Sequence, residues 1–496
     1  MSSYDFVVLG AGPAGRRAAI QAAKLGHSVL VVDDRSKVGG VSVHTGTIPS
    51  KTLRETALNL SGWRERAFYG QGYRTKDNIE SGDLNQRIAK TFEYEVSVLE
   101  HQFARNGVQT ANGRGAFVGP NKIAIESICG DARMTEVVDA KKVLISVGTK
   151  PFRPDHIPFN STNVLDSDTF ILQPRMPRSL TVVGAGVIGL EYATIFSALD
   201  IPVTLIEPRE RLLDFMDAEI VEHLVHSMRE RGITLRLGCT LTHVHFSESG
   251  NPICQLGDGR LIGSEMVLFA AGRKGATGGL GLDKVGLEAD DRGRLVVDRA
   301  TFQTSNPDIY AAGDVIGFPS LASTSMEQGR AVACHAFGNP IEADDQKPPY
   351  GVYAVPELSS VGLTEEDARK AGIAYECGIA RFRETSRGHI MGLESGILKL
   401  ICDRATRKLI GVHVIGEGAS ELVHIGQAVI NLGGTIDYFV ENSFNYPTLA
   451  EGYKVAALDL WNRLQVQPSS EDAETEGVAP EETEEDAGQA VRRAAA

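Results

Sequence analysis

A short apolar run, a glycine-rich turn and a helical stretch follow one another twice along the chain. The first copy has an apolar strand at 6–9, a helical stretch at 16–25 and a second apolar strand at 28–32. The second copy starts 174 residues later and repeats this order over 180–206, with its helical stretch at 190–199. Strands that alternate with helices in this way predict parallel β-sheets covered by helices, so the expected fold class is α/β.

Each copy carries the spacing Gly-x-Gly-x-x-Gly between its first strand and its helix. The first glycine permits a tight turn, the second lets a pyrophosphate approach the backbone, and the third lets the helix pack on the strand. An acidic residue ends the second strand of each copy, 23 residues after the first glycine, where it can accept hydrogen bonds from ribose hydroxyls. One such motif also occurs in ordinary tight turns, but two copies with matching acids predict two dinucleotide-binding units. The residues concerned are Gly10, Gly12, Gly15, Asp33 and Asp34 in the first unit, and Gly184, Gly186, Gly189 and Glu207 in the second.

Length and charge limit the class of protein further. A chain of 496 residues suggests about three domains, and 42% hydrophobic with 23% charged residues is typical of a globular protein. Half of the net charge of −14 lies in the C-terminal tail, where nine carboxylates precede Arg492 and Arg493. This composition predicts a disordered tail. The rest of the chain is only mildly acidic, so we expect neither nucleic acid nor a membrane as a partner.

Several features favour a cytoplasmic location. No stretch approaches the ~18–20 apolar residues of a membrane helix, and Met1–Gly12 runs directly into a strand, which leaves no room for a signal peptide. The cysteines form no close pair in sequence, so we expect buried, reduced thiols and predict no metal centre. These cysteines are Cys129, Cys239, Cys254, Cys334, Cys377 and Cys402.

Further motifs lie outside the two repeated units. They are Gly39-Gly40 with Gly46–Lys51, Val147–Pro151, Ala271–Arg273, Ile309–Val315 and Pro356–Glu365. Together with the repeats, they resemble the two-dinucleotide flavoprotein family of glutathione reductase and lipoamide dehydrogenase over about residues 4–465. The resemblance implies two Rossmann-like dinucleotide-binding domains and an α+β dimerisation domain, with FAD in the first unit and a nicotinamide dinucleotide in the second. It also implies a homodimer or higher homo-oligomer.

The resemblance further implies domain boundaries. An FAD-binding domain over 1–151 and 276–346 is interrupted by an NAD(P)-binding domain over 152–275. A dimerisation domain covers 347–466, and the acidic tail covers 467–496.

The family's cofactor contacts are carried over onto matching positions. For FAD these are Gly10, Gly12, Gly15, Asp33, Asp34, Gly39, Gly40, Ser42, Thr47, Lys51, Gly148, Asp314 and Ala322. For NAD(P) they are Gly184, Gly186, Gly189, Glu191, Glu207, Arg209, Arg211 and Gly272. Asp314 is expected to hold the ribityl chain, although it could simply close a turn after Gly313. A helix beginning near Ala322 is expected to direct its positive N-terminus at the flavin.

Two departures from the family remove its disulfide chemistry. Ser42 and Thr47 stand where disulfide-reducing members carry two cysteines, and a hydroxyl cannot form a dithiol–disulfide couple. Tyr446 stands in place of the histidine that serves the thiols, and tyrosine, with a pKa of about 10, is a poor base near neutrality. Tyr446 and Glu451 are expected to pack a dimer interface, or Tyr446 to fill the space of the missing disulfide substrate.

The chemistry that remains is hydride exchange between a flavin and nicotinamides. The resemblance implies Si-specific transfer between NADPH and NAD⁺, in a ping-pong reaction through flavin N5. Lys51 and Glu191 are expected beside the flavin, where the ammonium favours its reduced state; the alternative is a structural salt bridge. An NAD(P)H:quinone reductase or diaphorase is the competing enzyme, and a silent FAD-binding scaffold is a third alternative that this pair disfavours.

The second unit contains opposing signals for cofactor choice. Glu207 favours the free ribose hydroxyls of NAD and repels a 2′-phosphate. Arg209 and Arg211 follow it directly and could pair with that phosphate. Alternatively, both arginines are solvated loop charges, in which case NADPH would bind far more weakly than NADH.

Overall fold

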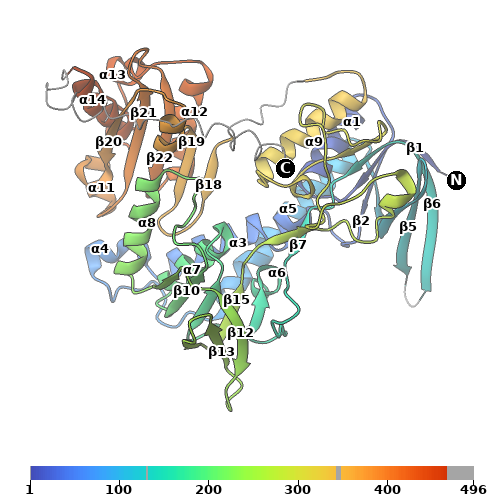
Figure 1. Ribbon diagram of the computed structural model, residues 1–496, viewed down its shortest axis with the longest axis horizontal. Helices are drawn as coiled ribbons and strands as arrows, with labels where there is room; N and C mark the ends of the chain where they lie inside the picture. The colour runs from blue at the N-terminus through green and yellow to red at the C-terminus, as the bar shows by residue number, and fades with distance from the viewer. Residues whose placement is uncertain (1, 130–131, 342–347, 466–496) are drawn as a thin grey trace, which may run out of the picture.

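The computed structural model describes residues 2–129, 132–341 and 348–465, which form three main sheets with their covering helices (Figure 1). The predicted acidic tail lies outside the described residues. Among the described helices, none combines the length and the apolar character needed to cross a bilayer. The second sheet is wholly parallel, and the first is parallel except for its β6-β5-β4 edge, which confirms the predicted α/β class.

The first sheet is built from the N-terminal residues and one strand that returns from much later in the chain. Its strand order is β3-β2-β1-β6-β5-β4, and β17 pairs in parallel with β6. The strands are β1 (Ser3–Leu9), β2 (Val29–Asp33), β3 (Gln109–Asn112), β4 (Arg114–Gly119), β5 (Lys122–Cys129), β6 (Ala132–Ile145) and β17 (Ile309–Ala311). The helices of the same chain segments are α1 (Pro13–Lys24), α2 (Gly40–His44), α3 (Thr47–Leu60), α4 (Arg66–Tyr69), α5 (Ser81–Arg105) and α9 (Ala322–Ala336), of which α3 also packs against the second part. Helix α9 begins where the sequence predicted it.

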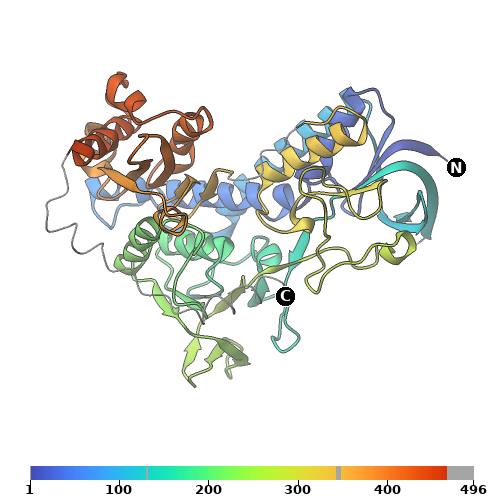
Figure 2. The same ribbon diagram turned by 45° about the horizontal axis from the view of Figure 1, so that its top comes forward.

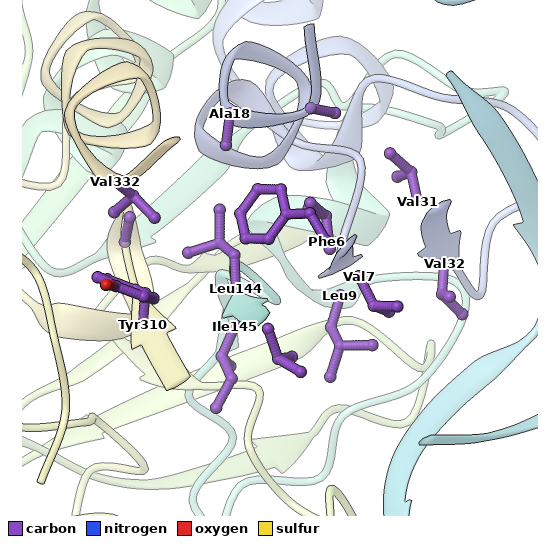
Figure 3. Packing of buried hydrophobic residues seen from close by; sticks show 14 of the residues in the cluster. Phe6, Val7, Leu9, Ala18, Val31, Val32, Leu144, Ile145, Tyr310 and Val332 are labelled. Carbon is purple, nitrogen blue, oxygen red and sulfur yellow. The ribbon is translucent and has the colours of Figure 1, made fainter. Parts of the chain in front are cut away.

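The core of this part lies between the sheet and two helices, α1 and α9, that run side by side (Figures 1 and 3). Phe6, Leu144 and Tyr310 come from three different strands, and each is at most 1% exposed. Ala18 and Val332 close the core from the two helices (Figure 3). Each large apolar side chain buried in this way stabilises the fold by about 1.5–3 kcal/mol, and together they fix the glycine turn that leads into α1.

The second sheet repeats this architecture with the order β11-β10-β9-β15-β8, and all of its pairings are parallel. Its strands are β8 (Val164–Asp166), β9 (Leu180–Val183), β10 (Val203–Glu207), β11 (Thr234–Leu237) and β15 (Met266–Phe269). Its helices are α6 (Ser167–Phe170), α7 (Val187–Ala198) and α8 (Ala218–Glu230). A small antiparallel sheet is attached to it, formed by β12 (Leu241–Phe246), β13 (Pro252–Leu256) and β14 (Leu261–Gly263). An antiparallel ribbon of β7 (Thr149–Pro151) and β16 (Arg273–Gly275) lies where the chain passes between the first and second sheets.

Both motif helices begin three residues earlier than predicted, at Pro13 and Val187. The periodicity predicts the third glycine of each motif before the helix, but it lies inside the first turn. A Cβ on Gly15 would lie 1.9 Å from the Gly10 carbonyl oxygen, and one on Gly189 would lie 1.9 Å from the Gly184 oxygen. The third glycine therefore permits the helix to start directly against the turn.

The third sheet is antiparallel, with the order β18-β19-β22-β21-β20. Its strands are β18 (Tyr350–Val352), β19 (Leu358–Gly362), β20 (Tyr375–Arg381), β21 (Ile397–Asp403) and β22 (Leu409–Ile415). Its helices are α10 (Glu365–Lys370), α11 (Ser386–Met391), α12 (Ala419–Asn431), α13 (Asp437–Glu441) and α14 (Glu451–Gln465). Figure 2 shows that the second sheet, in green, lies beside both of the other parts.

The cysteines agree only in part with the prediction of buried thiols. The five cysteines whose side chains are described are all free, and three of them, Cys254, Cys334 and Cys402, are buried. Cys239 and Cys377 are half-buried, which corrects the prediction for these two. Both lie at positions that are only partly covered, since Cys239 follows the edge strand β11 and Cys377 lies on the edge strand β20.

Candidate functional site

A cavity of about 210 Å³ opens at the carboxyl ends of the strands of the first sheet. Ten of the residues predicted to contact FAD line it, whereas Gly15 and Gly39 do not, and Lys51 lines the neighbouring cavity instead. The ten residues are Gly10, Gly12, Asp33, Asp34, Gly40, Ser42, Thr47, Gly148, Asp314 and Ala322.

A second cavity, of about 980 Å³, opens at the corresponding end of the second sheet. Six of the residues predicted for the nicotinamide dinucleotide line it: Gly184, Gly186, Glu191, Glu207, Arg209 and Gly272. Gly189 and Arg211 do not. The two cavities adjoin, because Thr47, Asp314 and Ala322 line both of them.

The middle glycine of each motif shows that both cavities suit a ligand that approaches the backbone. Gly186 has ordinary backbone angles (φ −69°, ψ 179°), and a Cβ on it would meet no described atom within 4 Å. The nearest described atom to a Cβ on Gly12 is the Gly40 Cα, at 3.9 Å. Neither the backbone nor the protein packing requires glycine at these positions. The space beside them, at the N-termini of α1 and α7, fits a phosphate group.

The acids at the ends of β2 and β10 hold the glycine turns by equivalent hydrogen bonds. Asp33 accepts from the backbone N–H of Ala11 at 2.6 Å and from that of Arg35 at 2.9 Å. Glu207 accepts from the N–H of Ala185 at 2.6 Å and from that of Arg209 at 3.1 Å. Sequence analysis predicted only a ribose contact for these acids. Their second role is to fix the residue after the first glycine of each motif.

The two acids differ in their electrostatic environment. Burial raises the pKa of Asp33 above its ordinary value, and its hydrogen bonds only partly oppose this effect. Burial also acts to raise the pKa of Glu207, but the side chain of Arg209, with Nε 2.9 Å from Oε1, and the two backbone N–H groups outweigh it and lower the pKa. Glu207 is therefore ionised at neutral pH, with Arg209 folded against it.

Arg209 and Arg211 occupy different environments although they are two residues apart. Arg209 lines the larger cavity between Glu207 and Asp214, and its Nη1 lies 3.5 Å from Asp214. Arg211 is directed at Glu366 on α10, with 3.7 Å between Nη2 and Oε1. Of these two arginines, Arg209 lines the cavity, whereas Arg211 contacts Glu366.

A partly buried ion pair lies in the wall of the larger cavity. Lys51 on α3 donates to both carboxylate oxygens of Glu191 on α7, each at 2.8 Å. Glu191 is 3% exposed and also accepts from the Tyr353 backbone N–H at 3.0 Å. The Lys51 ammonium lies 4.7 Å from the centre of the Tyr353 ring. These contacts fix the ammonium in the wall of the larger cavity.

Asp314 lies in the shared wall, close to the first turn of α9. It accepts from the Thr149 hydroxyl at 3.5 Å, and that hydroxyl accepts from Arg273 Nε at 2.9 Å. Burial raises the pKa of Asp314, and the charge of Arg273 acts in the opposite direction. This arrangement directs a carboxylate and the N-terminus of a helix into the same space, which suits hydroxyl groups beside an electron-rich ring.

The residues that stand in place of the family's redox cysteines and histidine make ordinary polar contacts. The Ser42 hydroxyl donates to the Gly39 carbonyl at 2.9 Å, and Thr47 begins α3. Tyr446 is 64% exposed and shares a hydrogen bond with Ser386. One oxygen of Glu451 is buried and has no hydrogen-bond partner among the described residues.

Sequence analysis missed several residues of the larger cavity. Tyr350 and Tyr353 precede the Pro356 motif, and Arg292 and Arg294 lie on a loop after the crossover ribbon. Burial raises the pKa of Tyr350 to about 12, with the charge of Glu191 adding to this effect, so its hydroxyl stays protonated. None of these four residues forms a recognisable spacing pattern, so no local signal could have identified them.

Comparison with known proteins agrees with this geometry. Residues 4–329 match the model of the pyridine nucleotide-disulphide oxidoreductase family, and residues 348–457 match the dimerisation domain of that family. The chain is 47% identical over 465 residues to the soluble pyridine nucleotide transhydrogenase of Mycobacterium tuberculosis, covering 94% of this chain and 98% of that protein. It is 40% identical to the protein of the same name from Pseudomonas putida, covering 93% and 99%.

Solved structures show the same architecture. LpdA of Mycobacterium tuberculosis is 26% identical and superposes with a TM-score of 0.83, covering 94% of this chain and 100% of that one. The HOCl-induced flavoprotein disulfide reductase RclA of Escherichia coli is 24% identical, has a TM-score of 0.82 and covers 92% and 99%, which establishes a shared fold. The family matches span most of the described residues and include both glycine motifs. The chain therefore belongs to the pyridine nucleotide-disulphide oxidoreductase family.

Proposed function

We propose that this protein is an FAD-dependent enzyme that transfers hydride between NADPH and NAD⁺. The observation that carries the proposal is that the two cavities adjoin. The larger one is lined by Lys51 and Glu191, and Ser42 and Thr47 replace the redox cysteines in the smaller one. The relatives named soluble pyridine nucleotide transhydrogenase, similar over nearly their full length, support the same reaction.

The residues of the smaller cavity fit FAD. Gly12 and the N-terminus of α1 would hold its pyrophosphate, Asp33 its adenosine ribose and Asp314 its ribityl hydroxyls. Bound FAD would supply a two-electron store for hydride exchange between nicotinamides. The N-terminus of α9 and the Lys51 ammonium would both favour negative charge on the ring.

The residues of the larger cavity fit a nicotinamide dinucleotide. Gly186 and the N-terminus of α7 would hold its pyrophosphate, while Glu207 and Arg209 would contact the adenosine ribose. The Arg209 guanidinium compensates the charge of Glu207 and can pair with a 2′-phosphate, so both NADPH and NAD⁺ are accepted. Glu191 orients Lys51, and Tyr350 and Tyr353 limit the access of water to the junction.

The proposed function also implies a domain organisation and an oligomeric state. We infer an FAD-binding domain over 1–151 and 276–346, an NAD(P)-binding domain over 152–275 and a dimerisation domain over 347–466. We also infer a homodimer with Si-specific hydride transfer. The free thiols support a reducing compartment such as the cytoplasm.

One anaerobic experiment tests the reaction. Purified protein is mixed with NADPH, the flavin absorbance is followed until it bleaches, and NAD⁺ is then added. We expect NAD⁺ to restore the absorbance within the turnover time and to yield NADH. Bleaching that only a quinone reverses would assign the protein as a quinone reductase. Failure to bleach at all would leave a silent FAD-binding protein.

A further inference from the structure

A fully buried lysine on the third sheet contacts the connection between β10 and α8, the segment that carries Arg209. Lys399 lies on β21 and is 0% exposed. Its ammonium donates to Asp217 at 3.0 and 3.2 Å, contacts Glu219 at 2.9 Å, and donates to Glu365 as well. Asp217 and Glu219 belong to the second, nucleotide-binding part of the chain, whereas Glu365 begins α10. One cation thus joins carboxylates from two parts of the molecule.

The connection in question covers residues 208–217, between the end of β10 and the start of α8. At its first end, Glu207 accepts from the backbone N–H and the side chain of Arg209. At the C-terminal end of the connection, Asp217 occupies the N-cap position of α8 and contacts Lys399. In Figure 1, α8 lies beside the sheet that contains β22, and the two elements are in contact.

Two further contacts hold the same connection to α10. The Glu365 backbone N–H donates to Asp217 at 3.5 Å, and Arg211 pairs with Glu366. Between these points, Leu213 is 1% exposed and has φ +43°, which is a strained angle for a branched side chain. A strained backbone of this kind persists only where its surroundings hold it in place.

The ionised state of the cluster is stable at neutral pH. Burial alone would lower the pKa of Lys399, but the charge of Asp217 and the hydrogen bonds to Glu365, Glu219 and Asp217 raise it instead. Burial acts to raise the pKa of Asp217, while the charge of Lys399 and its hydrogen bond lower the pKa overall. The contact is therefore a charged one, and loss of the cation would leave three carboxylates facing one another.

From this geometry we propose that Lys399 is a positioning residue that sets the affinity for the 2′-phosphate of NADPH. It acts by holding the 208–217 connection, and thereby Arg209, at the wall of the larger cavity. The pyrophosphate site at Gly184–Gly189 lies outside this connection, so the effect is confined to the 2′-phosphate. The inference rests on the proposed function, since it concerns the same dinucleotide site.

Two nucleotides that differ only in that phosphate provide the test. Binding of 2′,5′-ADP and of 5′-AMP to the FAD-loaded protein is measured by calorimetric titration, for the unaltered protein and for Lys399→Met. We expect Lys399→Met to weaken 2′,5′-ADP binding about tenfold and 5′-AMP binding less than about twofold. The matched control is Arg66→Met, which removes another buried cation, paired with Asp200 at the end of α7, away from the connection. It should leave the ratio of the two affinities unchanged.

Two milder variants keep the test decisive if Lys399→Met does not fold. Asp217→Asn retains the shape of the contact while weakening its charge, and Glu366→Gln breaks the surface contact with Arg211. The proposal expects both to weaken 2′,5′-ADP selectively. If Arg211 bound the phosphate itself, Glu366→Gln would free it and strengthen 2′,5′-ADP binding, which would overturn the proposal.

Equal weakening of 2′,5′-ADP and 5′-AMP binding in the folded variants would also overturn the proposal. So would an unaltered protein that binds 2′,5′-ADP no more tightly than 5′-AMP. These outcomes are distinct from failure of the proposed function. That failure is read from the unaltered protein alone, as a flavin that NADPH does not bleach or that NAD⁺ does not reoxidise.

Discussion

The Lys51 ammonium lies 2.8 Å from each of the two carboxylate oxygens of Glu191, although the residues are 140 positions apart in the chain. The contact joins α3, which follows the first glycine motif, to α7, which begins at the second. Because Glu191 is buried, it depends on this cation and on the Tyr353 N–H for compensation. The pair therefore links the two proposed nucleotide sites both structurally and electrostatically.

We expect Lys51→Met to slow flavin reduction by NADPH about 100-fold, because a fixed positive charge at the junction is lost. Stopped-flow measurement of flavin bleaching gives this rate. The double variant Lys51→Met with Glu191→Gln separates catalysis from structure, since it leaves no unpaired buried carboxylate. It should recover thermal stability while flavin reduction stays slow. Recovery of the rate as well would make the pair a purely structural salt bridge.

We expect Arg209→Ala to raise the KM for NADPH about tenfold and to change that for NADH by less than about twofold, because only NADPH carries the 2′-phosphate. Steady-state kinetics with each dinucleotide as donor provides the comparison. Arg211→Ala should have a smaller effect in the same direction, since Arg211 contacts Glu366 and does not line the cavity. Equal changes for NADPH and NADH would contradict a phosphate contact.

The second motif contains a matched pair of glycines for a third prediction. Gly186→Ala should change the free energy of unfolding by less than about 0.5 kcal/mol, because its Cβ meets no described atom within 4 Å. It should nevertheless weaken NADP⁺ binding at least about tenfold, because the methyl group occupies the space proposed for the pyrophosphate. Calorimetric titration and chemical unfolding measure the two effects.

The control is Gly189→Ala, whose Cβ would lie 1.9 Å from the Gly184 oxygen. We expect it to destabilise the protein by about 1–3 kcal/mol. A Gly186→Ala variant that binds NADP⁺ normally would show that the dinucleotide does not approach the backbone there.

The fourth prediction concerns pH and the buried His413 on β22. Its Nε2–H donates to the Leu363 carbonyl at 2.9 Å, and its Nδ1 lies 2.9 Å from the Ser360 hydroxyl. Burial lowers its pKa below the ordinary 6.5, although the charge of Asp217 opposes this effect. The unfolded state therefore binds a proton more readily, and stability that is complete above pH 6.5 is lost as the pH falls below it.

We expect the free energy of unfolding to fall by up to about 1.4 kcal/mol per pH unit between about pH 6.5 and 5, which lies above the ordinary pKa values of carboxylates. Urea unfolding at a series of pH values measures the slope. His413→Gln keeps a polar side chain without this titration and should flatten the profile. An unchanged slope in that variant would assign the pH dependence to other groups.

Much of the fold could be predicted because its signals are local. Gly10–Asp33 and Gly184–Glu207 each combine a strand, a turn and a helix within about 24 residues, so their periodicity identifies them without any tertiary information. Helices α1 and α7 begin three residues before the positions that the periodicity predicts, so that the third glycine lies within the first turn. Close packing against the turn outweighs its low helix propensity.

The sequence by itself determined the two nucleotide units, the α/β class and the loss of the redox cysteines, since each depends on residue identity and short-range spacing. Only the tertiary structure decided which charges meet. It separates Arg209 from Arg211, brings Tyr353 to Glu191, and places Lys399 against Asp217, 182 residues away. The physical reason is that these contacts arise between elements that pack for hydrophobic reasons, so the pairing of their polar side chains follows from how the sheets and helices come together.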